Sequence, residues 1–212
     1  MNFKPKIPES YYFQSYDTKE RWMSYWYQIN LALKTNSKKV LEVGFGNGTV
    51  SDCLKRAGLE VTTVDIDAGL NPDHICSVTE LTNIFKPNSF DAVLCYEVLE
   101  HIPFEYFEKA LDELDHVSNK FVILSLPYWG PQLSISLNAS LIGTKSLCIK
   151  LPLPTKHRFH SYAPGHYWEI GLRGYPLRKI TKILKKRFTI SERFVCPQNP
   201  YHLFFVLRKK PL

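Results

Sequence analysis

Lys38-Lys39-Val40-Leu41-Glu42-Val43-Gly44-Phe45-Gly46-Asn47-Gly48-Thr49-Val50 is the stretch that decides the fold class of this 212-residue chain. It predicts an apolar strand over 39–43, a loop with three alternating glycines and a helix over 48–57. Glycine adopts backbone conformations that other residues avoid, and it has no Cβ to hold a ligand away. On its own the loop fits either an ordinary strand-to-helix turn or a site for a small molecule that carries ribose.

The spacing of the glycines narrows the class of ligand. Dinucleotide folds place glycines at the first, third and sixth positions, where they set a helix N-terminus against a pyrophosphate. Here Thr49 stands at the sixth position, and Gly48 comes one residue early. Glu42 stands two residues before Gly44, where a carboxylate can meet the cationic end of an amino acid. The loop therefore predicts a ligand without phosphates.

Two further strands end in groups that suit the same ligand. The β-branched stretch 60–65 ends at Asp65, 21 positions after Gly44, near the spacing at which a carboxylate binds ribose hydroxyls. The apolar stretch 90–95 is followed by Tyr96 and Glu97. Because open α/β sheets bind ligands beyond the carboxyl ends of their strands, the sequence predicts one shared site there.

Hydrophobic periodicity predicts an alternation of strands and helices along most of the chain. It indicates a leading helix within 10–34, strands at 74–76 and 120–125, helices at 78–85, 104–117 and 176–187, and closing strands at 189–195 and 203–207. Such alternation predicts a parallel sheet. For the aromatic side chains of 10–34 we favour packing against the sheet over the alternative hypothesis that they line a substrate pocket.

These motifs resemble the class I S-adenosylmethionine-dependent methyltransferases, in particular the broad small-molecule group called type 11. The resemblance covers roughly residues 39–126 and is carried by Leu41 to Gly48, Val64-Asp65-Ile66-Asp67, Phe90-Asp91-Ala92-Val93 and Glu97-Val98-Leu99-Glu100-His101-Ile102-Pro103. It implies an α/β fold with a Rossmann-like seven-stranded, mostly parallel sheet, helices on both faces and an antiparallel C-terminal strand. It also implies S-adenosylmethionine as the cofactor.

The resemblance also implies cofactor-binding residues. Asp65 would hold the ribose hydroxyls, and Ile66 would lie against the adenine ring. Relatives commonly carry an aspartate near Ser77, so Asp73 or a backbone group is the alternative to Ser77 for the adenine contact. Tyr96 and Glu97 would border the sulfonium. The methionine portion would be held by Glu42, Gly44, Phe45, Gly46 and Gly48.

Length and composition predict a single domain, because 212 residues with 44% hydrophobic content supply one sizeable core but not two. Its expected parts are an N-terminal helical segment (1–37), a cofactor-binding core (38–126), an insert or lid (127–172) and a C-terminal helix and hairpin (173–212). We expect the insert to be irregular, since it contains several prolines and glycines.

The two halves of the insert differ in character. The apolar half, 133–143, fits four hypotheses: a cover for an apolar acceptor, a contact with a lipid surface, a contact with a second subunit, or packing beneath the lid. The polar and aromatic half, 157–169, is where we expect substrate recognition.

Three of the seven histidines fall within residues 157–166, close to Glu169. Neutral imidazoles bind zinc, but Pro164 and Gly165 interrupt any helix that would set the ligand geometry, and no cysteine pair assists. We therefore predict no metal site. Proton transfer from the acceptor is the other chemical role of histidine, with structural hydrogen bonding as the alternative at each position. The candidates are His101, which also fits a helix cap, and His157, His160 and His166.

The formal net charge is +7 and the pI is about 9.1, values that fit an acidic partner such as nucleic acid or a membrane surface. The excess charge lies mainly in 173–187 and 208–210, where a solvated helix face and tail explain it, so we do not expect nucleic acid as a partner. Five cysteines without paired spacing predict reduced, buried thiols. The absence of an export signal or a membrane-length apolar run predicts a cytoplasmic protein. The oligomeric state is open.

The predicted function is transfer of a methyl group from S-adenosylmethionine to an oxygen, nitrogen or carbon nucleophile of a small molecule by in-line displacement. An apolar or aromatic acceptor is one candidate. The first alternative is a cofactor-binding scaffold without catalysis. The second is an RNA methyltransferase. Base-modifying enzymes often show Asn-Pro-Pro-Tyr at the place where this chain has Cys95-Tyr96-Glu97-Val98, which counts against this alternative.

Overall fold

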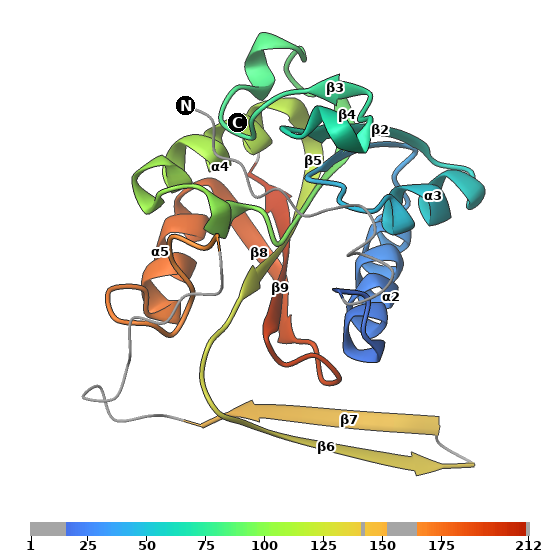
Figure 1. The fold of residues 1–212 in the computed structure, drawn as a ribbon, viewed down its shortest axis with the longest axis vertical. Coiled ribbons are helices and arrows are strands. Elements are labelled where there is room, and N and C mark those ends of the chain that lie inside the picture. Colours follow the sequence, from blue (N-terminus) through green and yellow to red (C-terminus); the bar gives the residue numbers. More distant parts are fainter. Residues whose placement is uncertain (1–15, 141–142, 152–164, 211–212) are drawn as a thin grey trace.

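A seven-stranded sheet forms the centre of the computed structural model, which describes residues 16–140, 143–151 and 165–210 (Figure 1). The strand order is β3-β2-β1-β4-β5-β9-β8. Strands β1 to β5 run parallel, and β9 runs antiparallel to both β5 and β8. This confirms the predicted sheet with its antiparallel C-terminal strand. The strands are β1 (Lys39–Val43), β2 (Glu60–Asp65), β3 (His74–Ile75), β4 (Phe90–Tyr96), β5 (Ser118–Pro127), β8 (Phe188–Val195) and β9 (His202–Lys209).

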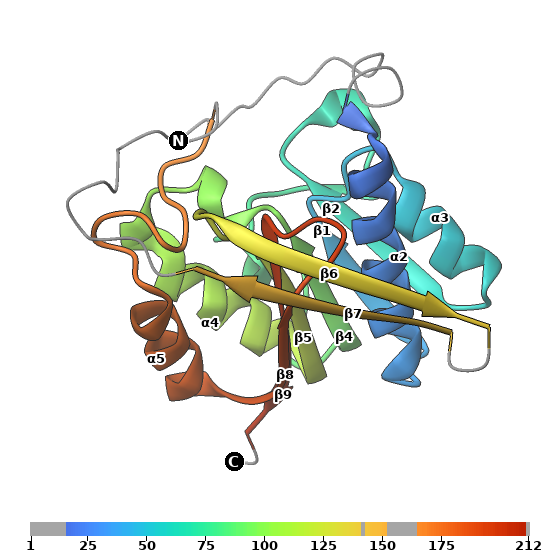
Figure 2. The ribbon, with the colours of Figure 1, turned by 90° about the horizontal axis from the view of Figure 1, so that it is seen from below.

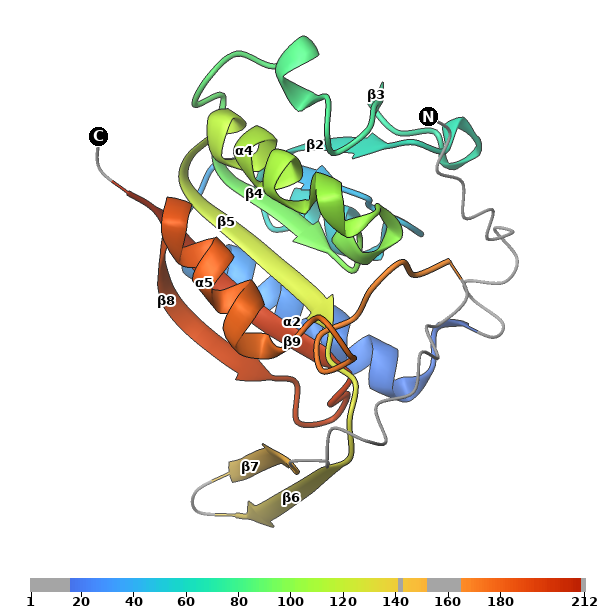
Figure 3. The ribbon, with the colours of Figure 1, turned by 90° about the vertical axis from the view of Figure 1, so that its left-hand side faces the viewer.

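Helices cover both faces of the sheet, as predicted. Helices α2 (Lys19–Lys34) and α3 (Thr49–Arg56) lie on one face, and α4 (Phe107–Val117) and α5 (Leu177–Arg187) lie on the other (Figures 1 and 3). Neighbouring residues of β1 enter opposite cores: Val40 packs with residues of α2 and α3, and Leu41 with residues of α4 and α5. A parallel sheet that is covered on both faces requires such uninterrupted apolar strands.

The predicted helix at 78–85 is wrong. This segment contains the short 3-10 turn η3 (Leu81–Asn83). Thr82 donates its backbone N–H and its hydroxyl to the Glu113 carboxylate of α4, at 2.7 and 3.2 Å. Because this N–H bonds a side chain from another element, it is not available for the backbone ladder of a helix. The predicted helix at 104–117 is α4 preceded by the 3-10 turn η5 (Phe104–Tyr106).

Helix α2 begins at Lys19, because the Thr18 side chain caps it by accepting a hydrogen bond from the backbone N–H of Arg21 at 3.3 Å. The rest of the predicted helix, before residue 16, lies outside the described residues. The structure confirms the favoured hypothesis, packing against the sheet, for Tyr27, and the substrate-pocket hypothesis stays untested. Tyr27 packs against Phe194 and Phe204 of the sheet, whereas Tyr25 lines the cavity described below.

The insert after Pro127 contains a regular hairpin, so the prediction of irregular structure is wrong for its apolar half. The hairpin consists of β6 (Gln132–Ala139) and β7 (Gly143–Lys150). It stands apart from the sheet at one end of the molecule (Figures 1 and 3) and crosses it when seen from that end (Figure 2). Alternation of apolar and polar residues at period two explains why these residues form strands.

The apolar face of the hairpin is exposed. Leu133 pairs with Ile149 and Ile135 with Leu147, and these four side chains and Leu137 are between 49% and 67% exposed. The polar face is tied to the body, because Lys150 donates to the Tyr128 carbonyl at 2.6 Å. Packing of these apolar side chains beneath a lid is therefore excluded, and the other three hypotheses remain. Residues 152–164, which carry most of the polar half of the insert, lie outside the described residues.

A helix able to cross a membrane would have to be long and apolar, and none of the helices in the described part of the chain is both.

Candidate functional site

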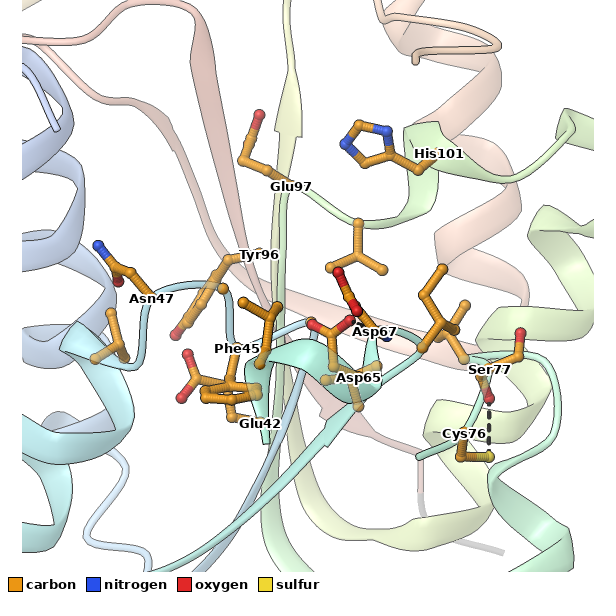
Figure 4. Close-up of a pocket in the computed structure, with 18 of the residues that line it drawn as sticks. Glu42, Phe45, Asn47, Asp65, Asp67, Cys76, Ser77, Tyr96, Glu97 and His101 are labelled. Atoms are coloured by element: carbon orange, nitrogen blue, oxygen red, sulfur yellow. Dashed lines mark hydrogen bonds between the residues drawn. The ribbon is translucent and has the colours of Figure 1, made fainter. Parts of the chain in front are cut away.

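A cavity of about 400 Å³ opens at the carboxyl ends of β1, β2 and β4 (Figure 4). Strand β1 lies between β2 and β4, so the chain leaves it toward one edge of the sheet and later returns to its other side. Such reversal points are where open α/β sheets form ligand crevices. Nine of the ten residues predicted to bind the cofactor line this cavity. The exception is Gly48, at the start of α3.

The glycine loop approaches the cavity closely because it has no side chains at three positions. Gly44 has φ +73°, and its N–H donates to the Val64 carbonyl at 2.7 Å. A Cβ on Gly44 would come within 2.2 Å of Cγ2 of Val98. Gly48 has φ +77° and is the N-cap of α3. Glycine is required at these positions by backbone conformation and, at Gly44, also by space.

Asn47 fastens this loop to the start of α2. Its amide donates to the Asp17 carboxylate at 2.7 Å, and its oxygen accepts the Thr49 N–H at 3.0 Å. The Tyr25 hydroxyl also donates to Asp17, at 2.7 Å. No sequence pattern indicated this contact, because Asp17 lies 30 residues before Asn47.

Glu42 is almost fully buried at the floor of the cavity. Its Oε2 has no hydrogen-bond partner among the described residues. Burial raises the pKa of this carboxyl to about 8. A buried carboxylate is unfavourable without a counter-charge, so this position favours a cationic ligand group.

Asp65 lies at the end of β2, where its Oδ1 accepts the Asp67 N–H at 2.9 Å. Burial raises its pKa. Ile66 is partly exposed and lines the cavity, as does Ser77, whose hydroxyl pairs with Thr79 at 2.9 Å. Asp73, the alternative to Ser77, is held by the N–H and hydroxyl of Thr63 instead, at 2.8 and 2.9 Å. It is not among the residues that line the cavity.

Tyr96 ends β4 and Glu97 follows it, and both line the cavity, where Figure 4 shows Glu97 on the same side as His101. The Tyr96 hydroxyl donates to the Gln28 carbonyl at 3.2 Å. Glu97 has φ +54°, a conformation that non-glycine residues rarely adopt outside functional sites. Its Oε2 lies 3.6 Å from Nε2 of His202, and burial raises its pKa to about 7.

The structure brings two of the predicted catalytic histidines together. The rings of His101 and His166 lie 4.7 Å apart, edge to face. Nδ1 of His101 is 3.0 Å from the Gly165 carbonyl, and Nδ1 of His166 is 2.9 Å from Oε1 of Glu169. Burial, and next the charge of His166, lower the pKa of His101 to about 4. His157 and His160 lie outside the described residues.

Residues from distant segments pack behind this side of the cavity without lining it, and no sequence pattern indicated a role for them. Glu100 is fully buried beside His166, and His202 at the start of β9 is fully buried beside Glu97. Trp168 fixes the segment that carries His166, because its indole N–H donates to the carbonyls of Leu99 and Ile102 at 3.1 and 3.2 Å. Sequence spacing carried no signal that these segments meet.

Known proteins are similar to this chain in the segment that forms the cofactor side of the cavity. Residues 41–120 match the family model described as a methyltransferase domain. A ubiquinone biosynthesis O-methyltransferase of Idiomarina loihiensis is 37% identical over 79 residues, which are 31% of this chain and 32% of the relative. One from Xanthomonas euvesicatoria pv. vesicatoria is 31% identical over 88 residues, which are 35% of this chain and 37% of the relative. The match thus spans about a third of the length of these relatives.

Solved structures share the whole fold. The magnesium protoporphyrin IX methyltransferase of Synechocystis PCC 6803, solved with bound SAH, has a TM-score of 0.61 at 16% identity over 98% of this chain and 90% of its own. The 1,6-didemethyltoxoflavin-N1-methyltransferase of Burkholderia thailandensis, solved with 1,6-didemethyltoxoflavin and S-adenosylhomocysteine, has a TM-score of 0.58 at 15% identity over 98% of this chain and 93% of its own. These structures confirm the fold, and the family model confirms the methyltransferase resemblance over residues 41–120.

Proposed function

We propose, from the match of residues 41–120 to the methyltransferase-domain model and from the motifs of the cofactor cavity, that this chain is an S-adenosylmethionine-dependent methyltransferase, which transfers a methyl group from S-adenosylmethionine to an oxygen, nitrogen or carbon nucleophile of a small molecule. The observation that carries the proposal is that the glycine loop, Glu42 and Asp65 line one shared cavity at the strand ends. Its volume of about 400 Å³ lies within the range of small-molecule sites.

The residues of the cavity fit this cofactor. Its amino-acid end carries an ammonium group, and Glu42 offers a buried oxygen without a partner among the described residues. Gly44 lines the cavity, and because it has no Cβ it leaves room for the Val98 side chain, which lines the cavity beside it. Asp65 stands at the position that suits ribose hydroxyls. We propose these roles for Glu42, Gly44 and Asp65, with adenine against Ile66 and Ser77.

When bound, S-adenosylmethionine supplies an activated methyl group. The part of this chain is to hold the acceptor in line with that methyl group, exclude water and accept a proton from the acceptor. His101 is our first choice as proton acceptor, because its Nδ1 faces the Gly165 carbonyl and Nε2 is left as the basic nitrogen. Its low pKa keeps the imidazole neutral at neutral pH.

Asp65→Ala is expected to weaken binding of S-adenosylhomocysteine by between about tenfold and 150-fold, because hydrogen bonds to a charged group contribute about 1.5–3 kcal/mol. Isothermal titration calorimetry measures this directly. Glu60→Ala is the matched control, since Glu60 is an exposed acid on the same strand. Absence of binding to the unmodified chain would defeat both the enzyme and the scaffold hypotheses.

Turnover distinguishes the enzyme from its alternatives. Transfer of labelled methyl from S-adenosylmethionine to a small-molecule extract, followed by mass spectrometry, identifies the acceptor atom. Cofactor binding without any transfer would favour a scaffold. Transfer to RNA, with an affinity that falls as salt rises, would favour the RNA methyltransferase.

We further propose that the exposed face of the β6–β7 hairpin contacts an anionic lipid surface. Residues 121–168 include four basic residues and no Asp or Glu, so this stretch of the sequence, which contains the hairpin, carries a positive charge. Apolar side chains flanked by Lys and Arg bind anionic lipid through combined burial and charge attraction. A lipid-bound protein would reach apolar acceptors from the membrane side.

Leu137→Glu is expected to lower affinity for phosphatidylglycerol-containing vesicles by about tenfold or more, because it places a charge on the apolar face. Co-sedimentation with vesicles of graded phosphatidylglycerol content measures the effect. Leu33→Glu, an exposed leucine on α2, is the matched control. A dimer that Leu137→Glu dissociates would instead identify a second copy as the occupant of this face.

The cytoplasmic location stays a proposal that rests on the thiols. All five cysteines are free. Cys95 and Cys196 are buried as expected, whereas Cys53 on α3 is exposed, so the prediction of buried thiols is wrong there.

A further inference from the structure

Glu100, His101 and His166 each present one potential ligand atom, and these three atoms lie within 4.8 Å of one another. Glu100 and His101 come from the 3-10 turn η4 (Leu99–His101) after β4. His166 arrives from the end of the insert, where the Tyr167 N–H donates to the Glu100 carbonyl at 2.8 Å. The backbone thus holds the two segments together independently of any ligand.

Both histidines are oriented as metal-ligating histidines usually are. Nδ1 of His166 is 2.9 Å from the Glu169 carboxylate, and Nδ1 of His101 is 3.0 Å from the Gly165 carbonyl. An acceptor at Nδ1 places the proton there and leaves the Nε2 lone pair for a cation. Nε2 of His166 lies 4.0 Å from Oε1 of Glu100.

Glu100 supplies an independent observation that favours a cation. The charge of Arg21 acts on Glu100 and Glu97 from a distance, and the described residues show no ion pair or hydrogen bond from Arg21 to either carboxylate. The Glu100 side chain is 0% exposed, and neither of its carboxylate oxygens has a hydrogen-bond partner among the described residues. A buried carboxylate without partners is strongly unfavourable unless a cation or a proton neutralises it. The neighbouring buried Oε1 of Glu97 also has no partner in the described part of the chain, which adds to the demand for positive charge.

We propose that Glu100, His101 and His166 bind a divalent transition-metal ion of the zinc type, with Glu169 and Gly165 orienting the two imidazoles. Two imidazoles and one carboxylate are a ligand set that Zn²⁺, Co²⁺ and Fe²⁺ prefer, whereas Mg²⁺ and Ca²⁺ prefer oxygen ligands. Three protein ligands leave at least one position open, as in catalytic zinc sites.

Binding requires a small rearrangement. Ligand distances of about 2.0–2.2 Å in a tetrahedral site place neighbouring ligand atoms about 3.3 Å apart. The three atoms now lie within 4.8 Å of one another, so each pair would draw closer by at most about 1.5 Å. Glu169 anchors His166, so the shift must come from Glu100 and His101. Rotation of these two side chains can supply it.

The site adjoins the cofactor cavity, because His101 lines both. The open position would therefore receive an oxygen or nitrogen of the acceptor. This proposal goes beyond the proposed methyl transfer. With a cation bound, His101 is a ligand and not a base, so the role of proton acceptor proposed above for His101 applies only to the chain without the metal ion. The proposed site replaces the prediction from the sequence that the chain has no metal site. For that prediction Glu169 was weighed as a ligand, and Glu100 had no role.

The test uses the metal alone. The full chain, treated with chelator and dialysed, is titrated with Co²⁺ in the absence of cofactor, and visible absorption reports the ligand field. We expect one ion per chain, displaced by Zn²⁺. Glu100→Gln and His166→Ala should each weaken binding about 100-fold or more, and Glu169→Gln by about 10–100-fold through its orienting contact. Glu105→Gln and His74→Ala, which change exposed groups, are the matched controls.

Absence of Co²⁺ and Zn²⁺ binding to the unmodified chain would overturn the proposal. Binding that survives Glu100→Gln and His166→Ala together would overturn it as well, because the ion would then lie elsewhere. S-adenosylhomocysteine binding to each variant checks that it is folded. Because that assay tests the cofactor cavity and the Co²⁺ titration tests only the histidine cluster, failure of one proposal is distinguishable from failure of the other.

Discussion

Trp168→Ala is expected to lower the free energy of unfolding by about 3–5 kcal/mol, the range for removal of a fully buried tryptophan. Trp168 is 0% exposed and packs edge to face against Phe104 and Phe107. Its indole N–H is shared between the carbonyls of Leu99 and Ile102, which flank Glu100 and His101. Urea unfolding, with midpoint and slope both fitted, measures the loss.

Two variants separate the causes of this effect. Trp168→Phe keeps much of the apolar volume and removes the N–H, so we expect a loss of about 1–3 kcal/mol, mainly from the Ile102 carbonyl, because the Leu99 carbonyl keeps the Ile102 N–H at 3.4 Å. Trp26→Ala changes a tryptophan that is 54% exposed, and its effect should stay within about 1 kcal/mol. If Trp168→Ala were as mild as Trp26→Ala, the segment that carries His166 would be held by its backbone hydrogen bonds instead.

Glu42→Gln is expected to weaken S-adenosylmethionine binding at pH 8 by between about tenfold and 150-fold, because the cofactor's ammonium loses its charged partner. In the ligand-free chain the pKa of Glu42 is about 8, so below this pH binding must release a proton from it. The contribution of Glu42 therefore makes affinity rise with pH, by at most about tenfold per pH unit, and level off above about pH 8. Calorimetry in buffers of different ionisation enthalpy counts the released proton.

The same carboxyl predicts how stability without ligand depends on pH. Its pKa is raised from the ordinary 4.5 to about 8, so the folded chain binds more protons than the unfolded chain between these values. The stabilisation is fully present below about pH 4.5 and is lost as pH rises toward 8. Glu97 titrates in the same range, so the measured quantity is the difference between the unmodified chain and Glu42→Gln, with Glu60→Gln as the exposed control. Parallel pH profiles for the two proteins would contradict the assigned pKa.

The cofactor side of the site was predictable because its signals are local. The positive φ of Gly44 and Gly48 follows from the residue type that such a turn demands, and the position of Asp65 follows from where a β-branched run stops. The helix at 78–85 failed for the opposite reason, since Glu113 of a distant helix takes the N–H of Thr82. The helix propensity of residues 78–85 carries no information about a hydrogen-bond partner on a distant helix.

The hairpin shows the same division between local and tertiary information. Alternation over 132–150 specifies two strands with one apolar face, but it does not specify which face turns toward the body. The contact between Lys150 and the Tyr128 carbonyl turns the polar face inward and leaves Leu137 outside.

By itself, the sequence determined the parallel sheet and the glycine loop with Glu42 and Asp65 at adjoining strand ends, because hydrophobic period and glycine position act over a few residues. Only the tertiary structure decided that Glu100 and His101 meet His166 and Glu169, since their contact depends on where the chain returns after the insert and on the buried Trp168 that fastens it. Charge and burial at that meeting point are properties of neighbours in space, and no spacing along the chain encodes them.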